Sequence, residues 1–476
     1  MDTLRDAAPG LIAALAVALD VLAAGHAVLH KRDNRAAVGW VGVILGLPLG
    51  GAALYWAFGI NRVHRRASAL YRDLVRHPRP RSRATGPALI GLDHPLVELA
   101  EVIDRVASFS LVPGNAVHPL ENGDAAYPEM LAAIDAAERS ISLETYIFDH
   151  DAAGVAFIDA LARAVARGVE VRVLIDAVGA RYSFPTVLGP LRRRGVHAAL
   201  FNRNALPWRW TYANLRTHRK ILVIDGTIGF TGGLNLRAGH VLAGAPTHPI
   251  MDLHFKVVGP VVTQMQVAFA EDWAFATREH LHGERWFSAP PPAGDMVCRG
   301  IIDGPDLDLD KLRWTLLGAF ACARRRVRLV TPYFLPESDL VAAIRTAVLR
   351  GVSVEIVLPG KNNQVLVQWA CAAMLPQVVA DGCRVWETQG AFDHSKLLVV
   401  DDHWVLFGST NIDPRSLRLN FEFNIECYSH GLAREMHALI DRKIERARPM
   451  TQARLAARPL HHRLRDGVAR LFIPYL

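Results

Sequence analysis

The pattern His-x-Lys-x4-Asp occurs twice in this chain of 476 residues. Its members are His218, Lys220 and Asp225 in the first copy, and His394, Lys396 and Asp401 in the second. Because alternate residues of an extended strand point to the same side, the His and Lys of each copy are expected to share one face. Two such strands brought together would surround one pocket with two imidazoles and two ammonium groups. These groups are suited to attacking a phosphodiester and stabilising its charge without a metal.

Two further features accompany the motif. Each copy is followed, ten residues after its aspartate, by an asparagine, Asn235 in the first case and Asn411 in the second. Lysine is scarce, with seven Lys against 47 Arg, yet two of the seven fall inside the motifs. We expect Lys220, Lys396, Asn235 and Asn411 to donate hydrogen bonds to phosphate oxygens. The alternative interpretation is that these are ordinary surface residues of two strands.

Acidic residues are expected to orient the histidines. An imidazole that attacks through one ring nitrogen needs the other nitrogen held, usually by a carboxylate. Asp252 and Glu422, which follow the two trailing asparagines, are the candidates, and an ordinary salt bridge is the alternative for either. Asp225 and Asp401 lie an odd number of positions from their histidines, so their side chains point to the other side of the strand. We therefore expect these two aspartates to tie strand ends to neighbouring groups.

The duplicated motif resembles that of the phospholipase D superfamily. The segments 252–260 and 413–422, which follow the two copies, narrow the resemblance to bacterial cardiolipin synthases, and it spans nearly the whole chain. The resemblance implies an α/β fold with two tandem phospholipase D-like α/β-sandwich repeats. The repeats would form one pseudo-twofold catalytic unit, preceded by a transmembrane helical hairpin.

The resemblance also implies a mechanism. The reaction would pass through a phosphohistidine, with His218 as the nucleophile and His394 as the acid and then the base. The reversed assignment stays open because the two halves are nearly symmetric. In similar enzymes, acidic residues at the positions of Asp252 and Glu422 pair with the catalytic histidines. The motif aspartates count there as part of the active-site signature, and we expect neither a cofactor nor a metal site.

The composition favours an acidic partner. The formal net charge is +8 and the sequence pI is about 9.4, which suits nucleic acid or an anionic membrane. The five cysteines form no CxxC pair and no zinc-binding spacing, so we interpret them as reduced core residues. The sequence also contains no phosphate-cradling Walker loop and no dinucleotide-binding fingerprint.

The N-terminal region contains two apolar stretches, residues 11–30 and 36–60, each long enough to cross a bilayer as a helix. Asp20 would be costly in lipid and is expected to face the second helix or to lie shallow. Arginines concentrate in residues 62–83, which predicts a hairpin with both termini and the catalytic domain in the cytoplasm. The resemblance to bacterial cardiolipin synthases implies that this multi-pass anchor lies in the bacterial inner membrane. A cleaved signal peptide and a solvated linker are the respective alternatives for the first stretch and the basic segment.

From about residue 110 the pattern alternates between strands and helices, and the same order returns in the second half. The predicted strands are 141–146, 169–175, 327–331 and 352–358, and helices are expected to stop at Gly168 and Gly351. The expected domains are a membrane anchor (1–62), a basic linker (63–109), a first repeat (110–290), a second repeat (291–430) and a basic helical C-terminal tail (431–476).

Two surface features are candidates for lipid contact. A basic and aromatic cluster, which precedes the first motif, consists of Arg203, Trp208, Arg209 and Trp210. We expect it to form part of a lipid entrance, and a loop packed on the core is the alternative. The apolar C-terminal end, residues 467–476, is expected either to rest on the membrane surface or to pack against the catalytic core.

The leading hypothesis is a membrane-bound cardiolipin synthase that transfers a phosphatidyl group between two phosphatidylglycerol molecules and releases glycerol. Phosphatidylethanolamine is an alternative donor. A phospholipase D acting on other phospholipids is the runner-up, because the same residues would serve if water resolved the intermediate. A nuclease is disfavoured by the anchor and by the lack of nucleic-acid modules, and a non-enzymatic scaffold by the two intact motifs. The oligomeric state is left open.

Overall fold

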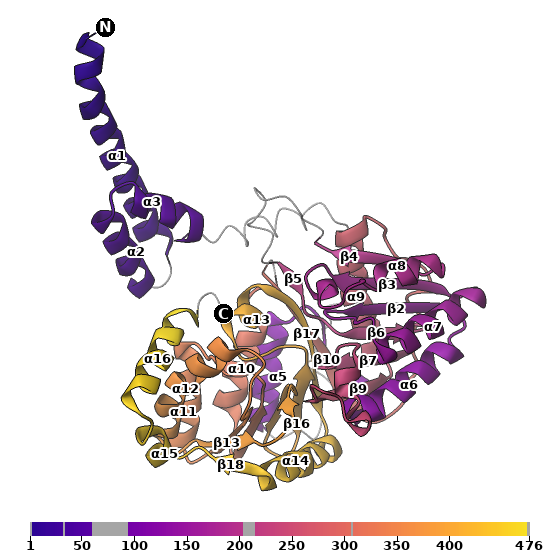
Figure 1. Cartoon of the computed structure of the whole chain (residues 1–476). Coiled ribbons are helices and arrows are strands. Elements are labelled where there is room, and N and C mark those ends of the chain that lie inside the picture. The colour runs from indigo at the N-terminus through magenta and orange to yellow at the C-terminus, as the bar shows by residue number, and fades with distance from the viewer. Residues whose placement is uncertain (1, 32–33, 60–93, 203–214, 306–307, 474–476) are drawn as a thin grey trace. The chain divides into compact units, whose positions relative to one another are not determined.

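The computed structural model of the chain describes residues 2–31, 34–59, 94–202, 215–305 and 308–473. Contacts within the chain divide it into two compact units, Met1–Arg66 and Ala67–Leu476 (Figure 1). The described part of the first unit is helical. The second unit is an α/β structure that contains both copies of the His-x-Lys-x4-Asp motif.

The N-terminal unit consists, in its described part, of α1 (Asp2–His30), α2 (Asn34–Gly46), α3 (Gly50–Leu54) and a π-helical turn, η1 (Tyr55–Gly59). The single helix predicted for residues 36–60 is therefore wrong. Pro48 has no amide hydrogen with which to continue a helix. Leu49 adopts a left-handed backbone conformation, with φ of 64°, between α2 and α3. The hydropathy of residues 36–60 gives no sign of this interruption, because the residues around it are also apolar.

Asp20 compensates for the interruption. Both of its carboxylate oxygens accept a hydrogen bond from the Leu49 amide, at 3.2 and 3.3 Å. The carboxylate thereby satisfies a backbone donor at the start of a helix, where helices leave amides without partners. The prediction that Asp20 faces the second helical segment is confirmed. Across the described residues, no helix combines the length and the apolarity needed to cross a membrane.

The strands of the second unit form a long mixed sheet in which equivalent strands follow in the same order on both sides of the middle, with β18 as an additional edge strand on one side. At the middle, β1 (Val112–Glu121) pairs antiparallel with β10 (Met296–Asp303). Outward from β1 run β9 (Leu253–Val258), β7 (Ile228–Gly232), β6 (Ile221–Ile224), β2 (Ser140–Thr145), β3 (Glu170–Asp176) and β4 (His197–Phe201). Outward from β10 run β17 (Asn420–Tyr428), β16 (Trp404–Gly408), β15 (Leu397–Val400), β11 (Arg326–Val330), β12 (Ser353–Pro359), β13 (Arg384–Thr388) and β18 (Ala447–Pro449). The two halves are thus related by a pseudo-twofold arrangement.

Helices cover the sheet, which explains why its strands read as continuous apolar runs. The strand β6 reads Ile-Leu-Val-Ile, β15 reads Leu-Leu-Val-Val, and every residue of both is buried. Strands covered on both faces have no solvent-facing side, so apolar and polar residues do not alternate along them. The helices of the first repeat are α6 (Asn122–Ala136), α7 (Ala152–Ala166), α8 (Leu188–Arg193) and α9 (Val261–Thr277). Those of the second are α10 (Lys311–Cys322), α11 (Ser338–Leu349), α12 (Val365–Val379) and α14 (His430–Glu445).

The repeated helix stops are confirmed. Gly168 follows α7 with φ of 87° and Gly351 follows α11 with φ of 88°. Glycine adopts this left-handed conformation without the steric cost that a Cβ would add. The four predicted strands are present as β2, β3, β11 and β12, each displaced by one residue from its predicted bounds.

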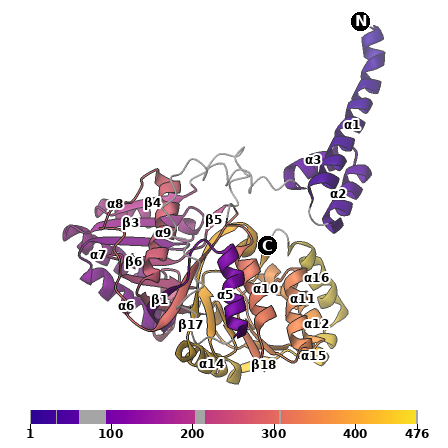
Figure 2. The same ribbon diagram turned by 180° about the vertical axis from the view of Figure 1, so that it is seen from behind.

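The helix α5 (His94–Val106) corrects the predicted domain boundaries. It lies within the segment 63–109 that we interpreted as a basic linker. Its apolar residues Leu96, Leu99 and Ile103 are buried in the core of the second repeat, beside α10 (Figure 2). The basic linker therefore does not extend through this helix.

The C-terminal tail is part of the second repeat. The strand β18 pairs with β13 at the edge of the sheet, and α15 (Gln452–Ala456) follows it. The last described helix, α16 (Leu460–Leu471), lies beside α12 and buries Ala469 against Val367 and Ala370 (Figure 1). Of the two alternatives for residues 467–476, packing against the catalytic core applies to Ala469, whereas Val468, Leu471 and Phe472 are exposed. Residues 474–476 lie outside the described residues.

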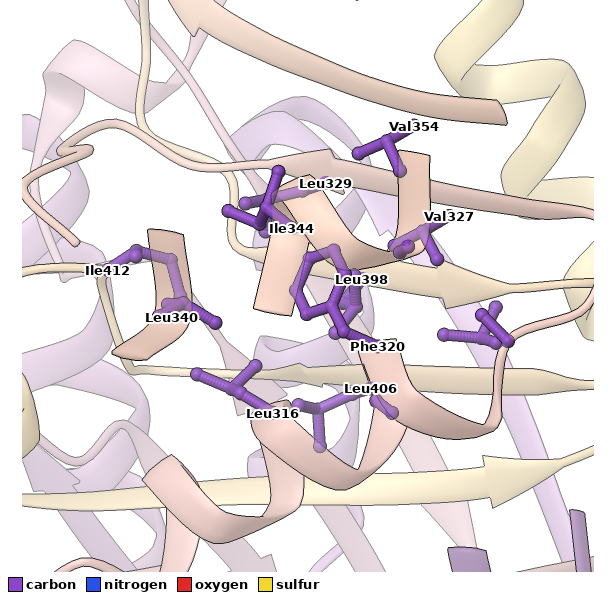
Figure 3. Packing of buried hydrophobic residues seen from close by; sticks show 14 of the residues in the cluster. Leu316, Phe320, Val327, Leu329, Leu340, Ile344, Val354, Leu398, Leu406 and Ile412 are labelled. Carbon is purple, nitrogen blue, oxygen red and sulfur yellow. The ribbon is translucent and has the colours of Figure 1, made fainter. Parts of the chain in front are cut away.

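The core of the second repeat offers a test of the fold. Leu398 on β15 is 2% exposed and lies among Leu316, Phe320 and Leu406 (Figure 3). We expect Leu398→Ala to lower the free energy of unfolding by about 2–5 kcal/mol, because the cavity cannot be refilled. The control Leu349→Ala, at a side chain that is 74% exposed, should change it by less than about 0.5 kcal/mol. Urea denaturation followed by circular dichroism measures both, and equal effects would contradict this packing.

Candidate active site

Both motif segments lie where one repeat reaches across to the other. His218 to Lys220 connect β5 (Arg216–Thr217) to β6, and β5 pairs with the start of β17 in the second repeat. His394 to Lys396 connect β14 (Phe392–Asp393) to β15, and β14 pairs with β8 (Ile250–Met251) of the first repeat. Two short parallel bridges therefore join the repeats beside the two motifs.

The first histidine is held by the second repeat. Its amide donates a hydrogen bond to the carbonyl of Phe421 at 2.9 Å. The next residue along β17 is Glu422, and its two carboxylate oxygens each lie 3.1 Å from Nδ1 of His218. The Nε2 atom of His218 is then the ring nitrogen left for chemistry.

The second histidine is held in the same way by the first repeat. The amide of His394 donates to the carbonyl of Met251 at 2.8 Å, and Nδ1 lies 2.8 Å from a carboxylate oxygen of Asp252. Each motif histidine therefore pairs with the acid of the other repeat. Both acids were identified from the sequence, but this crossed pairing was not.

The two acids are supported differently. Glu422 accepts hydrogen bonds from the Ser409 hydroxyl at 2.5 Å and from the side-chain amide of Asn420 at 3.2 Å. At the position equivalent to Ser409, the first repeat has Gly233, where a Cβ would lie 2.1 Å from the Asp252 carboxylate. A glycine is thus required at this position, because any side chain would clash with the Asp252 carboxylate that pairs with His394.

The motif lysines point back along their own segments. Nζ of Lys220 donates to the His218 carbonyl at 2.7 Å, and Nζ of Lys396 donates to the His394 carbonyl at 2.5 Å. Burial lowers the pKa of Lys220 to about 7 and that of Lys396 to about 8, and the charge of Lys396 adds to the lowering at Lys220. Two like charges held in a low-dielectric pocket favour the arrival of an anion.

The imidazoles are neutral at rest. Burial lowers the pKa of His218 to about 4, against the opposing influence of Glu422. Burial also lowers the pKa of His394, and the charges of Lys396, Lys220 and His218 lower it further. The four motif side chains thus lie near enough to affect one another's protonation, as expected for one shared pocket. A neutral imidazole with a free Nε2 can act as a nucleophile or as a base.

Comparison with known proteins agrees with this geometry. A family model described as "Cardiolipin synthase, PLD-like domain" matches residues 130–273 and 316–444. The cardiolipin synthase A of Pseudomonas entomophila is 30% identical, over 98% of this chain and 98% of its own length. The chain belongs to the cardiolipin synthase family. The cardiolipin synthase 1 of Bacillus anthracis, 28% identical, covers 94% of this chain and 90% of its own length.

The fold has a solved counterpart outside the cardiolipin synthase family. The crystal structure of a phosphatidylserine synthase from Haemophilus influenzae covers 76% of this chain and 95% of that one, with a TM-score of 0.60 and 14% identity. A second family model, described as "Phospholipase_D-nuclease N-terminal", matches residues 18–59. The predicted α/β class with two phospholipase D-like repeats is confirmed.

The asparagine side chains form no hydrogen bond with the motif lysines in the described structure. The side-chain oxygen of Asn235 accepts a hydrogen bond from the Ile147 amide at 3.1 Å. The Asn411 side chain donates to the Ser416 hydroxyl at 3.3 Å, while its oxygen is buried without a hydrogen-bond partner among the described residues. Their predicted contact with phosphate stays a prediction.

The motif aspartates bind backbone amides. Asp225 accepts hydrogen bonds from three successive amides, 138 to 140, where β2 begins. Asp401 accepts from amides 324 to 326, where β11 begins. Both residues have positive φ, 52° and 50°. These contacts fasten each motif strand to its neighbour, in agreement with the structural interpretation, and neither aspartate hydrogen-bonds a motif histidine.

Two tyrosines beside the pocket were missed from the sequence. The ring of Tyr146 lies 5.3 Å from that of His218 and 5.7 Å from the Lys220 ammonium. The ring of Tyr333 lies 6.4 Å from that of His394. Both follow equivalent strands, β2 and β11, but at positions that differ by one residue, so an alignment of the two repeats does not pair them.

The remaining predictions concern the basic and aromatic cluster and the question of a metal site. The basic and aromatic cluster of residues 203–210 lies outside the described residues. Within the described part of the chain, no group of three or more His, Cys, Asp or Glu side chains could hold a metal ion.

The lysine pKa values predict an alkaline limit to activity. Each ammonium is charged below its pKa and loses its charge as the pH rises through about 7 for Lys220 and about 8 for Lys396. Because His218 stays neutral down to about pH 4, kcat/KM should be highest between about pH 4 and 7 and should fall as the pH rises through about 7 to 8. A pH profile with a short-chain phosphatidylglycerol measures this. A rate that climbs steadily to pH 10 would contradict charged lysines as phosphate ligands.

The crossed pairing can be tested with two matched variants. We expect Glu422→Gln to change the ¹⁵N signal of His218 Nδ1 and leave that of His394 unchanged, and Asp252→Asn to do the reverse. Each variant should lower kcat by about 10²–10⁴-fold, because its histidine loses its fixed tautomer. The spectra are recorded on ¹⁵N-histidine-labelled protein and assigned with single histidine variants. A response confined to the histidine of the same repeat would overturn the crossed arrangement.

Proposed function

We propose that this protein is a cardiolipin synthase that converts two phosphatidylglycerol molecules into cardiolipin and glycerol. The proposal depends on one observation. Each motif histidine is neutral and is oriented by the acid of the other repeat, beside two buried lysines. Such a site supplies a nucleophile, a proton carrier and two cations within one pocket. Membership of the cardiolipin synthase family and the names of its curated relatives support the same reaction.

In the first step, Nε2 of His218 attacks the phosphorus of one phosphatidylglycerol. A P–N bond forms, the P–O bond to the headgroup glycerol breaks, and His394 gives a proton to the departing oxygen. Glu422 stabilises the positive charge that grows on the His218 ring. Although burial alone would raise it, the pKa of Glu422 is lowered by His218 and Lys220, so this carboxylate stays ionised.

In the second step, His394 takes the proton from a hydroxyl of a second phosphatidylglycerol. That oxygen attacks the phosphorus, the P–N bond breaks, and cardiolipin leaves with His218 neutral again. Lys220 and Lys396 stabilise the charge on the non-bridging oxygens in both steps, and we propose that Asn235 and Asn411 donate to the same oxygens.

The proton carrier requires the substrate. At rest the pKa of His394 lies well below its usual value, so near neutral pH the ring keeps only the Nδ1 proton that faces Asp252 and has none on Nε2 to give. A bound phosphodiester brings a negative charge between the two lysines, and an opposite charge nearby favours the protonated imidazole. Substrate binding therefore charges the acid at the moment when the leaving glycerol needs it.

We also propose that the N-terminal unit holds the protein in the bacterial inner membrane as a multi-pass hairpin, with the catalytic unit on the cytoplasmic side. The apolar stretches within residues 11–60, the arginines of residues 62–83 and the match of residues 18–59 to a second family model support this. Reporter fusions at each terminus test the orientation.

The reaction is tested with purified full-length protein in phosphatidylglycerol vesicles containing EDTA, followed by lipid mass spectrometry. Cardiolipin and free glycerol are expected. Phosphatidic acid alone would make the protein a phospholipase D, the alternative function. If no product forms, phosphatidylethanolamine as the donor is the next test, and failure with both lipids would overturn the proposal.

The histidine roles predict different behaviour for two matched variants. His218→Ala and His394→Ala should each lower turnover by at least about 10³-fold. With a p-nitrophenyl phosphodiester, whose leaving group needs no proton, His394→Ala should release a burst of one p-nitrophenolate per protein and retain a covalent adduct. His218→Ala should give no burst. Rapid-quench kinetics and mass spectrometry of the adduct measure both, and the opposite pattern would make His394 the nucleophile.

A further inference from the structure

The outward face of α16 is apolar although it faces solvent. The exposed fractions are 68% for Leu460, 62% for Leu464, 56% for Val468, 71% for Leu471 and 51% for Phe472, which directly follows the helix. Their spacing of three and four residues places these side chains on one side of the helix. We name these five residues the α16 stripe. Contiguous exposed apolar side chains of this kind mark an interaction surface.

The other face fixes α16 to the second repeat. Ala469 is 2% exposed and packs against α12, and the Arg465 guanidinium lies 4.4 Å from the centre of the Trp369 ring. The Asp466 carboxylate is buried and paired with Arg458 and Arg465. The helix is therefore held in place by its polar and small residues, and the α16 stripe is left without a partner within the described structure.

The charges around the α16 stripe indicate what covers it. The exposed ionisable residues of α16 are His461, Arg463 and Arg470, and its single acid, Asp466, is buried. A second copy of the same face would bring like charges together, which disfavours a symmetric dimer through this surface. An anionic lipid surface matches both properties, because acyl chains accept the apolar side chains and headgroups pair with the arginines.

We propose that α16 is a membrane-docking helix that inserts the α16 stripe into the interface of an anionic bilayer. Docking places the pocket in a defined relation to the lipid. Tyr333, whose ring lies 6.4 Å from that of His394, packs against the same apolar cluster as Ala469. At the start of α12, Val365 and Leu366 are also exposed, by 53% and 48%, and enlarge the apolar surface. The His394 side of the pocket is thereby brought towards the headgroups.

The docking is tested with a probe on α16 itself, so that other membrane contacts of the chain do not affect the result. The full-length protein carries His218→Ala to prevent turnover, and Val468→Cys labelled with the fluorophore NBD. It is reconstituted with phosphatidylcholine alone or with an equimolar mixture of phosphatidylcholine and phosphatidylglycerol. The same labelling of protein without Val468→Cys measures the background from native cysteines.

The proposal expects a blue-shifted emission, quenched by lipid-borne quenchers, in the anionic mixture. Arg463→Gln with Arg470→Gln should raise the phosphatidylglycerol fraction needed for half of the shift by on the order of fivefold or more. Leu464→Asp with Leu471→Asp should abolish the shift, whereas the control Leu349→Asp, at an isolated exposed leucine, should not. Three results would each overturn the proposal. They are the absence of a shift, an equal shift in phosphatidylcholine alone, and a shift in detergent that depends on protein concentration.

An activity measurement separates docking from the proposed reaction, on which this second test rests. In protein with His218 intact, Leu464→Asp with Leu471→Asp should raise the apparent KM for vesicle phosphatidylglycerol and leave kcat on short-chain substrate unchanged. An unchanged KM would argue against a role of docking in substrate delivery. If no cardiolipin forms in either protein, the proposed function fails while the fluorescence result still decides the docking.

Discussion

The contact of each motif histidine with the carboxylate of the other repeat is the constraint on which the rest of the catalytic unit depends. An imidazole is useful only if its ring is turned correctly, so the starts of β9 and β17 must be fixed against the motif segments of the opposite half. The continuous sheet through β1 and β10 supplies the coarse alignment, and the bridges β5–β17 and β8–β14 supply the final register. The two apolar cores keep these strands from moving independently.

Burying this many ionisable groups is costly, and the structure limits the cost by reducing the charge at rest. The imidazoles are neutral, the lysines bind backbone carbonyls, and the lysine pKa values are lowered towards neutrality. A phosphodiester anion bound beside the two lysines would favour the charged forms of both lysines and of His394. In the proposed mechanism, binding of the substrate anion and protonation of the acid are therefore the same electrostatic event.

The sequence predicted the components better than their connections. The duplicated motif, both orienting acids, the strands and the glycine stops follow from local patterns of two to ten residues. The crossed pairs join residues 204 and 142 positions apart, and such contacts have no local signal. The break at Pro48 and Leu49 was hidden by continuous hydropathy. The helix α5 was hidden by the basic charge of its neighbours, although Leu96, Leu99 and Ile103 already had helical spacing.

Gly233 and Ser409 occupy equivalent positions in the two repeats but are different residues. This difference gives the two motif histidines different surroundings. The serine hydroxyl binds Glu422, while the missing side chain at Gly233 makes room for Asp252. In an assembly of two identical chains, any substitution at this position would alter both imidazoles together. Because the repeats are joined in one polypeptide, each half can change alone. The covalent link thus allows a symmetric framework to hold two chemically unequal histidines.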